Sequence, residues 1–339
     1  MNNNDLKIRE IEDLIKKNYN IGNIKEINKV LEGASSECFH IITENKEYIL
    51  KDVEMIFKNH PEDEPLINNI LLKRGVCVSE FYKNKENKYL LEYHGHTFHL
   101  QSFIRGKILE VNTAPQWFMK ESAEILGKIH KALEDIPVLS SGIGKEFFSF
   151  ITPESAKISY EKSLQRAIEN NESQNIIDLK YRISLLEKIK DIKLEMNKFT
   201  YKNTHGDYFI SQIICGENSI NGIIDFTSAC IHPACWEVIR SYSYADPKCI
   251  DGTIDFDNLV KYIKDYMKYS SLNKYDIKMM PYLYYYQLAV SDYFSQYYES
   301  NNSNKEVLGY YAHWSTIICR WFEKNIEELT GNLEKVFGL

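Results

Sequence analysis

The sequence predicts an α+β protein of two lobes, with an antiparallel sheet in the first lobe and mainly helices in the second. Short apolar runs separated by turn residues fill the region from about residue 24 to 103, a pattern typical of antiparallel strands. From Asn112 onward, apolar residues recur at helical spacing over long stretches. A chain of 339 residues is long enough for two cores. We therefore expect lobes at 1–103 and 104–339.

The N-terminal lobe is expected to contain two helices beside its strands. Isoleucines recur at helical spacing over residues 8–15, which predicts a short amphipathic helix. The runs at 38–43 and 47–52 alternate and flank a turn, as in a hairpin. A second helix is expected over 61–75, because acidic residues occupy its first turn and a glycine ends it.

The C-terminal lobe is expected to be helical with one exception. Two short apolar runs, 210–215 and 220–226, flank a Gly-Glu-Asn turn and predict a small hairpin within this lobe. The helical stretches are 123–130, 175–198, 255–269 and 282–321.

Charge and composition exclude several classes of function. The formal net charge is −7, whereas general nucleic-acid binders present a surplus of Lys and Arg. No apolar run approaches the roughly 20 residues of a membrane span, and the N-terminus lacks a signal-peptide pattern. The seven cysteines are scattered without a CxxC pair, so neither disulfides nor a zinc site are indicated. We expect a cytoplasmic protein that binds neither nucleic acid nor membrane.

Two aspartates carry the strongest chemical signal. Asp207 ends the tripeptide His-Gly-Asp, and Asp225 follows the second run of the predicted hairpin. Phosphoryl transfer needs one carboxylate to orient the attacking hydroxyl and accept its proton, and another to hold magnesium. The pair suits these roles. The alternative is that each aspartate only forms a turn or caps a helix.

These motifs resemble those of a known family. The segment HGDYFISQ at 205–212, followed by IDF at 224–226, is similar to the catalytic loop and metal-binding motif of aminoglycoside phosphotransferases, choline kinases and bacterial homoserine kinases. The resemblance covers nearly the whole chain and implies a bilobal, protein-kinase-like fold. It also implies that Asp207 is the catalytic base, Asp225 the principal Mg²⁺ ligand and His205 a brace of the loop.

The same resemblance implies a site for ATP, or another nucleoside triphosphate, in the first lobe. Gly33, Ser35 and Ser36 lie where the family has its nucleotide-covering loop, and a glycine there allows close approach of the backbone to phosphate. Lys51 ends a predicted strand and matches the lysine that contacts the phosphates. By itself it would be an ordinary solvated lysine.

Two further features complete the expected nucleotide site. Glu64 matches the ion-pair partner of the lysine, although Glu62 and Asp63 compete for this role. The segment around Ser102 and Ile104 resembles the hinge between the lobes, whose backbone groups would read the adenine edge.

The chain departs from the family at two positions. Gln212 stands where the family has an Asn as second metal ligand; its longer side chain shifts the oxygen in a site that demands near-ideal geometry. Glu237 stands where many relatives have Asp, in a position expected to brace the catalytic loop. The first departure leaves an alternative open, a nucleotide-binding pseudokinase of the spore-coat type.

Three nearby histidines, His94, His96 and His99, raise the question of a metal site. Strand alternation would place His94 and His96 on one face and His99 on the other, with no Cys or carboxylate to complete the set. We expect ordinary strand histidines.

Aromatic residues are frequent in the stretch from 282 to 298, and Trp236 precedes that stretch in the same lobe. Such residues usually form helix cores, yet relatives build acceptor pockets from this region. An aromatic and acidic lining would suit a cationic acceptor. The sequence thus predicts an ATP- and Mg²⁺-dependent O-phosphotransferase acting on a small molecule, with an aminoglycoside-, choline- or homoserine-like acceptor.

Overall fold

The contacts of the chain divide it into two compact units. The first unit comprises Met1–Lys107 and Ile213–Ser228, and the second comprises Ile108–Gln212 and Ala229–Leu339. The computed structural model describes residues 8–30, 37–53, 61–139, 152–299 and 304–339.

Unit 1 is built on a six-stranded sheet with the order β1-β2-β3-β6-β4, in which β5 also pairs with β6. All of these pairings are antiparallel. The strands are β1 (Ile24–Val30), β2 (Cys38–Thr43), β3 (Glu47–Asp52), β4 (Phe81–Tyr82), β5 (Leu90–Tyr93) and β6 (His96–Ser102), and the helices are α1 (Ile8–Asn18) and α2 (Asp63–Lys73).

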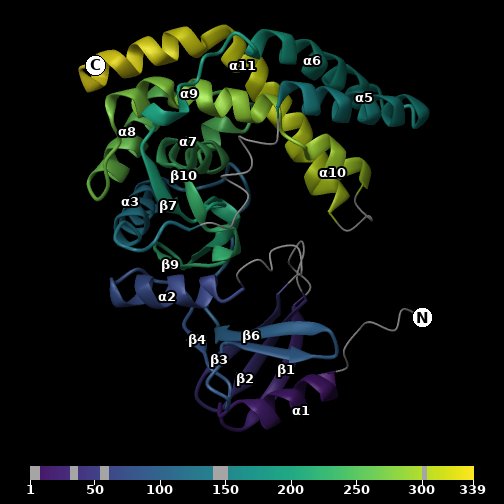
Figure 1. Cartoon of the computed structure of the whole chain (residues 1–339), viewed down its shortest axis with the longest axis vertical. Helices are drawn as coiled ribbons and strands as arrows, with labels where there is room; N and C mark the ends of the chain where they lie inside the picture. Colours follow the sequence, from purple (N-terminus) through teal and green to yellow (C-terminus); the bar gives the residue numbers. More distant parts are fainter. Residues whose placement is uncertain (1–7, 31–36, 54–60, 140–151, 300–303) are drawn as a thin grey trace. The chain divides into compact units, whose positions relative to one another are not determined.

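The core of unit 1 forms where α1 covers the sheet (Figure 1). Ile11 and Ile15 of α1 are fully buried together with Phe39, Phe98 and Leu100 of the strands. Burying apolar side chains of this size contributes about 1.5–3 kcal/mol each. The predicted amphipathic helix, the β2–β3 hairpin and the helix after it are therefore confirmed.

The chain returns to unit 1 with a second hairpin, β8 (Ile213–Cys215) and β9 (Ile220–Ile223). Lys107 exchanges two backbone hydrogen bonds with Cys215, each 2.8 Å long. Gly106 allows this close approach, because its φ is 151° and a Cβ atom there would lie 2.4 Å from the Cys215 carbonyl oxygen. The sequence analysis placed this hairpin in the helical lobe, whereas its contacts place it in unit 1.

Unit 2 is mainly helical, with one two-stranded antiparallel sheet that pairs β7 with β10. Its elements are α3 (Gln116–Ala132), α5 (Pro153–Glu169), α6 (Ser173–Ile189), β7 (Tyr201–Thr204), β10 (Cys230–Pro233), α7 (Ala234–Ala245), α8 (Phe256–Met267), α9 (Lys274–Ala289), α10 (Tyr293–Glu299) and α11 (Lys305–Phe337). The α+β class, with a sheet first and helices after it, is confirmed.

Some boundaries differ from the prediction for physical reasons. The long periodic stretch 282–321 contains parts of three helices, α9, α10 and α11, because helical spacing within each helix does not show where one helix ends and the next begins. Residues Ile210–Gln212 form a 3-10 turn before β8 begins. The β7–β10 pair joins two runs of four residues each that lie far apart in sequence, and so it leaves no local pattern.

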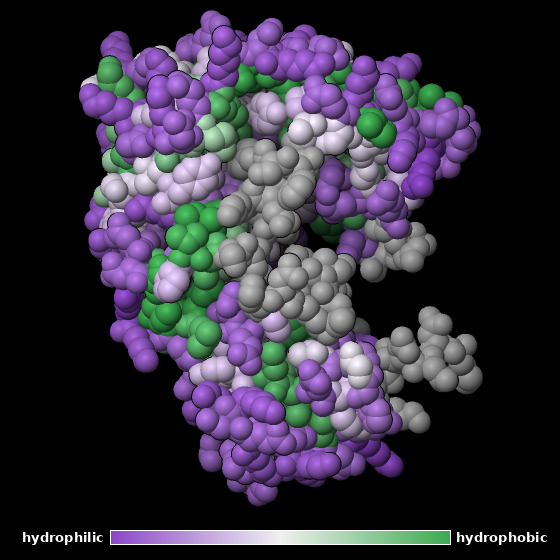
Figure 2. Space-filling model, in the orientation of Figure 1, coloured by the Kyte–Doolittle hydropathy of each residue, from purple (hydrophilic) through white to green (hydrophobic). Residues whose placement is uncertain are grey.

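The outer helices of unit 2 present a polar surface. Figure 2 shows the exposed faces of α5, α6 and α11 as mostly hydrophilic, with isolated apolar residues. Single exposed residues such as Ile158 and Ile177 are normal on a protein surface. Within the described residues, no helix combines the length and apolarity that a membrane crossing requires.

Candidate active site

In unit 1, the structure brings Lys51 and Asp225 together although 174 residues separate them in sequence. Lys51 Nζ donates to Asp225 Oδ1 over 2.8 Å. The lysine side chain is 11% exposed and the aspartate side chain 35% exposed. Burial by itself would lower the pKa of Lys51, but the charges of Glu64 and Asp225 outweigh it and raise that pKa. The lysine is therefore a fixed cation.

Glu64 is the acidic residue of α2 that faces this cluster. It is buried and accepts a hydrogen bond from the backbone N–H of Phe226 over 3.0 Å, whereas Glu62 is exposed and Asp63 half-buried. Burial raises the pKa of Glu64 to about 7, with the charge of Asp225 acting in the same direction and that of Lys51 against it.

Asp225 has an unusual backbone. Its φ is 66°, in the left-handed region that side-chain-bearing residues rarely occupy, Asp being one of the less disfavoured. Its Oδ1 also accepts a hydrogen bond from the Thr227 hydroxyl over 2.6 Å. Backbone strain of this kind concentrates at functional sites, where the surrounding structure maintains it.

The other residues of the predicted nucleotide site differ in whether the structure describes them and in whether their backbone groups are already hydrogen-bonded. Gly33, Ser35 and Ser36 lie outside the described residues. The backbone N–H of Ser102 is already bonded to the Glu80 carbonyl over 2.8 Å. In the described part of the chain, the N–H and C=O of Ile104 have no hydrogen-bond partner, so this residue retains the groups that an adenine edge would require.

In unit 2, Asp207 is held from two sides. Arg240 Nη2 donates to Asp207 Oδ1 over 2.7 Å, and Gln212 Nε2 donates to Asp207 Oδ2 over 3.2 Å. The Asp207 side chain remains 34% exposed. The amide nitrogen of Gln212 thus contacts the carboxylate, which leaves its amide oxygen for another partner.

The loop that carries Asp207 is braced by buried groups. The Nδ1 atom of His205 accepts the backbone N–H of Asp207 over 3.3 Å. Glu237 accepts the N–H of Tyr208 over 3.3 Å and pairs with His130 Nε2 over 2.8 Å. Burial would raise the pKa of Glu237, yet the hydrogen bond and charge of His130, the charge of His205 and the Tyr208 amide lower it to about 2. The carboxylate is ionised, as a brace must be.

Arg240 is a site residue that the sequence analysis missed. It lies on α7, three residues after Glu237, on the same side of the helix. That spacing is the only local signal of its position, since its partner Asp207 is 33 residues away.

Several aromatic residues of unit 2 form core packing, whereas others, such as Tyr297 and Tyr298, are half-buried. Tyr284, Tyr285 and Trp236 are all at least nine-tenths buried. Trp236 donates its ring N–H to Gln287 over 3.3 Å. The Trp236 ring already has a cation beside it, the guanidinium of Arg240.

The three histidines occupy different environments. His94 lies in the turn between β5 and β6 with a φ of 49°, so the expectation that it belongs to a strand is wrong; the neighbouring Gly95 has a φ of 86° and completes the reversal. His96 pairs with Asp52 over 2.7 Å, a carboxylate that the sequence analysis did not foresee. His99 is buried and stacks on Phe81. Among the described residues, no group of three or more potential ligands gathers at one point.

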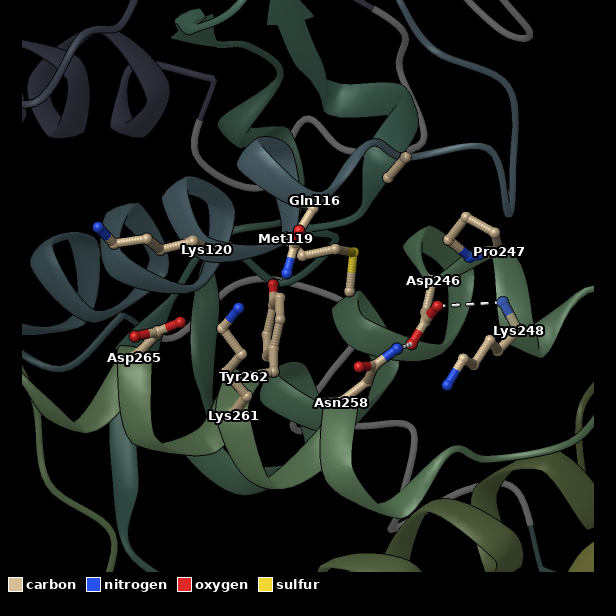
Figure 3. A pocket seen from close by; sticks show the side chains of 11 residues that line it. Gln116, Met119, Lys120, Asp246, Pro247, Lys248, Asn258, Lys261, Tyr262 and Asp265 are labelled. Atoms are coloured by element: carbon tan, nitrogen blue, oxygen red, sulfur yellow. Dashed lines mark hydrogen bonds between the residues drawn. The ribbon is translucent and has the colours of Figure 1, made fainter.

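A separate cavity of about 290 Å³ lies in unit 2 and contains none of the predicted site residues. Figure 3 shows Asp246 bonded to the Lys248 backbone and to Asn258, over 3.0 and 2.8 Å. Asp265, which also lines this cavity, pairs with Lys268 over 2.7 Å. Both carboxylates of the cavity therefore already have protein partners.

The comparison with known families agrees with this geometry. The model of the phosphotransferase enzyme family (APH) matches residues 26–261, a region that includes both clusters. The chain belongs to the phosphotransferase enzyme family. The resemblance inferred from the sequence motifs is thereby confirmed.

Relatives of this chain are distant in sequence. A curated homoserine kinase from Zymomonas mobilis is 24% identical over 227 residues, which span 66% of this chain and 65% of that protein. The solved structure of a spectinomycin phosphotransferase with ADP and spectinomycin is 17% identical, covers 97% of this chain and 99% of that one, and has a TM-score of 0.65. A microcompartment-associated aminopropanol kinase is 10% identical, covers 96% and 100%, and has a TM-score of 0.63. The likenesses to the two solved structures confirm the predicted fold.

Proposed function

We propose that this protein is a small-molecule kinase that transfers the γ-phosphate of ATP to a hydroxyl group. The observation that carries the proposal is the Lys51–Asp225 ion pair with the buried Glu64 beside it. A buried lysine is costly unless it is paired. This lysine lies within the segment that the family model matches, and the sequence motifs led us to expect a phosphate-contacting lysine at this position.

The residues of unit 1 fit a nucleotide and a divalent metal. Lys51 offers a point charge to phosphate oxygens, and the carboxylate of Asp225 is partly exposed, with the oxygen chemistry that Mg²⁺ prefers. Bound Mg²⁺ would neutralise the charge that develops on the phosphates. The free backbone groups of Ile104 would read the base, and Glu64 would keep Lys51 oriented.

The residues of unit 2 supply the acceptor side of the reaction. Asp207 would accept a hydrogen bond from the acceptor hydroxyl. As the hydroxyl oxygen bonds to the γ-phosphorus, the bond to the ADP leaving group breaks and the hydroxyl proton passes to the Asp207 carboxylate. Within the described residues the amide oxygen of Gln212 has no hydrogen-bond partner, and we propose it as a second oxygen ligand for the metal.

The charge of the acceptor is the finer part of the proposal. The net charge of −7 favours a cationic amino alcohol or aminoglycoside. The similarity to a homoserine kinase favours homoserine instead, an acceptor that carries an anionic carboxylate. We propose the cationic class, and a side-by-side panel with homoserine and neutral sugars decides between them.

The test has two stages. Thermal unfolding with ATP, with and without Mg²⁺, should show stabilisation that depends on both, because ligands that bind the folded state raise its stability. ATP turnover is then measured with each member of the acceptor panel. Stabilisation without turnover for any acceptor would favour the pseudokinase, and the absence of both would remove the proposed function.

A further inference from the structure

Arg240 differs from other cations of unit 2 in how it is enclosed. Its side chain is 11% exposed, and its guanidinium carbon lies 4.6 Å from the ring centre of Phe209, 5.4 Å from that of Trp236 and 5.3 Å from that of Tyr244. Contacts of a cation with aromatic faces at these distances are attractive. The aromatic rings therefore fix the guanidinium in place.

The enclosure leaves Arg240 with one strong polar contact. Its Nη2 bonds Asp207 Oδ1 over 2.7 Å, while its buried Nη1 has no hydrogen-bond partner among the described residues. In the same part of the chain, Asp207 is the only carboxylate with which Arg240 forms an ion pair. A buried donor without a partner is costly, so the fold tolerates this arrangement in order to direct the cation at Asp207.

Asp207 lies on a loop and its side chain is partly exposed, so a fixed partner bears directly on its orientation. It follows Gly206, whose φ is 81°, and its side chain is one-third exposed. A charge-assisted bond to a rigid guanidinium fixes the rotamer of a carboxylate. Gln212 adds only a longer bond to the opposite oxygen, 3.2 Å.

We propose that Arg240 is the positioning residue of the active site, which holds the Asp207 carboxylate in the orientation that receives the acceptor hydroxyl. The inference rests on the proposed phosphotransferase function. Arg240 contacts the carboxylate from the buried side and touches no reactant. The proton of the acceptor still passes to Asp207, and Arg240 acts only through that residue.

The chain offers a matched control, Arg182. It too is buried and lies over an aromatic ring, 5.4 Å from the centre of Tyr160, but its partners are hydroxyl, carbonyl and thiol groups, including Ser291 Oγ at 2.6 Å. Replacing Arg182 disturbs a buried cation of unit 2 without touching Asp207.

The experiment compares Arg240→Met, Arg240→Lys and Arg182→Met. ATP is the varied substrate, and turnover is divided by the amount of folded protein, which circular dichroism measures. Arg240→Met should lower kcat by about tenfold or more, because misplacing a catalytic group has effects on this scale, and should leave KM for ATP within about twofold. Arg240→Lys should restore part of kcat. Arg182→Met should lose activity only in proportion to its loss of folded protein.

The decisive measurement is the effect of Arg240→Met on kcat in a protein that already carries Asp207→Asn. If Arg240 acts through Asp207, Arg240→Met should there lower kcat by less than about twofold, since the two residues act as one unit. Equal losses in both backgrounds, or an unchanged kcat in Arg240→Met, would overturn the positioning role while the phosphotransferase function stands. A wild type without turnover would overturn both.

Discussion

Two ion pairs of nearly equal geometry, one in each unit, differ in what else surrounds the cation. Lys51 and Asp225 lie 2.8 Å apart, and Arg240 and Asp207 lie 2.7 Å apart. In both pairs the cation is 11% exposed and the carboxylate about one-third exposed, 35% and 34%.

The difference lies in the second partner. Lys51 has the charge of Glu64 as well as that of Asp225, whereas Arg240 has aromatic rings. If Asp225 turns towards a metal ion, Lys51 keeps the charge of Glu64 wherever that carboxyl is ionised, which its pKa of about 7 places at neutral pH and above. If Asp207 is removed, Arg240 keeps no counter-charge among the described residues. The comparison teaches that one carboxylate is free to change partners while the other is fixed.

The largest effect is expected at Asp207. Asp207→Asn should lower turnover by about 100-fold or more, because it removes the proton acceptor. Asp207→Ala should in addition lower the free energy of unfolding by about 2 kcal/mol more than Asp225→Ala does, because it leaves a buried cation without a counter-charge. The partial exposure of the ion pair keeps this loss below that of a fully buried pair. Urea unfolding of both alanine variants checks this. Equal losses of unfolding free energy would contradict the difference between the two ion pairs.

Asp225 is expected to affect binding more than stability. Asp225→Asn should weaken Mg²⁺-dependent nucleotide affinity by roughly 10- to 100-fold, on the scale of a lost ligand to a hard cation that prefers carboxylate oxygens. Calorimetric titration with ATP, with and without Mg²⁺, measures it. Asp207→Asn is the control and should keep its affinity. An unchanged affinity in Asp225→Asn would remove this residue from the metal site.

Glu64 should make unit 1 sensitive to pH. Its pKa rises from 4.5 to about 7 on folding, so between these values the folded protein holds a proton that the unfolded chain releases. The stability that Glu64 contributes is therefore present at low pH and is lost as the pH rises towards 7.

Glu64→Gln removes this dependence. The stability of the variant relative to wild type should increase by about 2 kcal/mol between pH 4.5 and 7.5, since one pKa unit corresponds to about 1.4 kcal/mol and the charges nearby screen part of the effect. Denaturant unfolding across this range checks it. Glu62→Gln, at an exposed position at the start of the same helix, is measured beside it as the control for the substitution itself.

The smallest effect is expected at Gln212. Gln212→Asn should leave turnover within about tenfold, or about 1.4 kcal/mol, if the amide oxygen is a metal ligand in an active enzyme. A silent wild type whose Asn variant gains activity at high Mg²⁺ would favour the pseudokinase. Full activity in Gln212→Ala, with the same metal dependence, would show that the side chain is no ligand.

Sequence reasoning succeeded where the pattern was local. The hairpin of β2 and β3 and the helix α1 each follow from alternation or helical spacing within a few residues. Glu64 was favoured over Glu62 and Asp63 by the resemblance alone, because neighbouring acidic residues differ in burial, which the structure supplies.

Long-range contacts account for most of what was missed. The bond from Arg240 to Asp207 depends on how α7 packs, and nothing in the intervening segment indicates it. The β7–β10 pair likewise depends on two four-residue runs meeting across the chain. Helix α5 had a local signal, the capping box of Thr152 and Ser155 at its start, which the analysis did not use.

Unit 1 is formed by two separate segments of the chain, which affects how the protein folds while it is being synthesised. Residues Ile213–Ser228 complete a unit that otherwise ends at Lys107. Because chains leave the ribosome from the N-terminus and units tend to fold as they emerge, unit 1 stays without the β8–β9 hairpin while 105 residues of the other unit, Ile108–Gln212, are being made. Nascent chains of this protein should therefore expose the edge of unit 1 near Lys107 to chaperones until translation has passed Ser228.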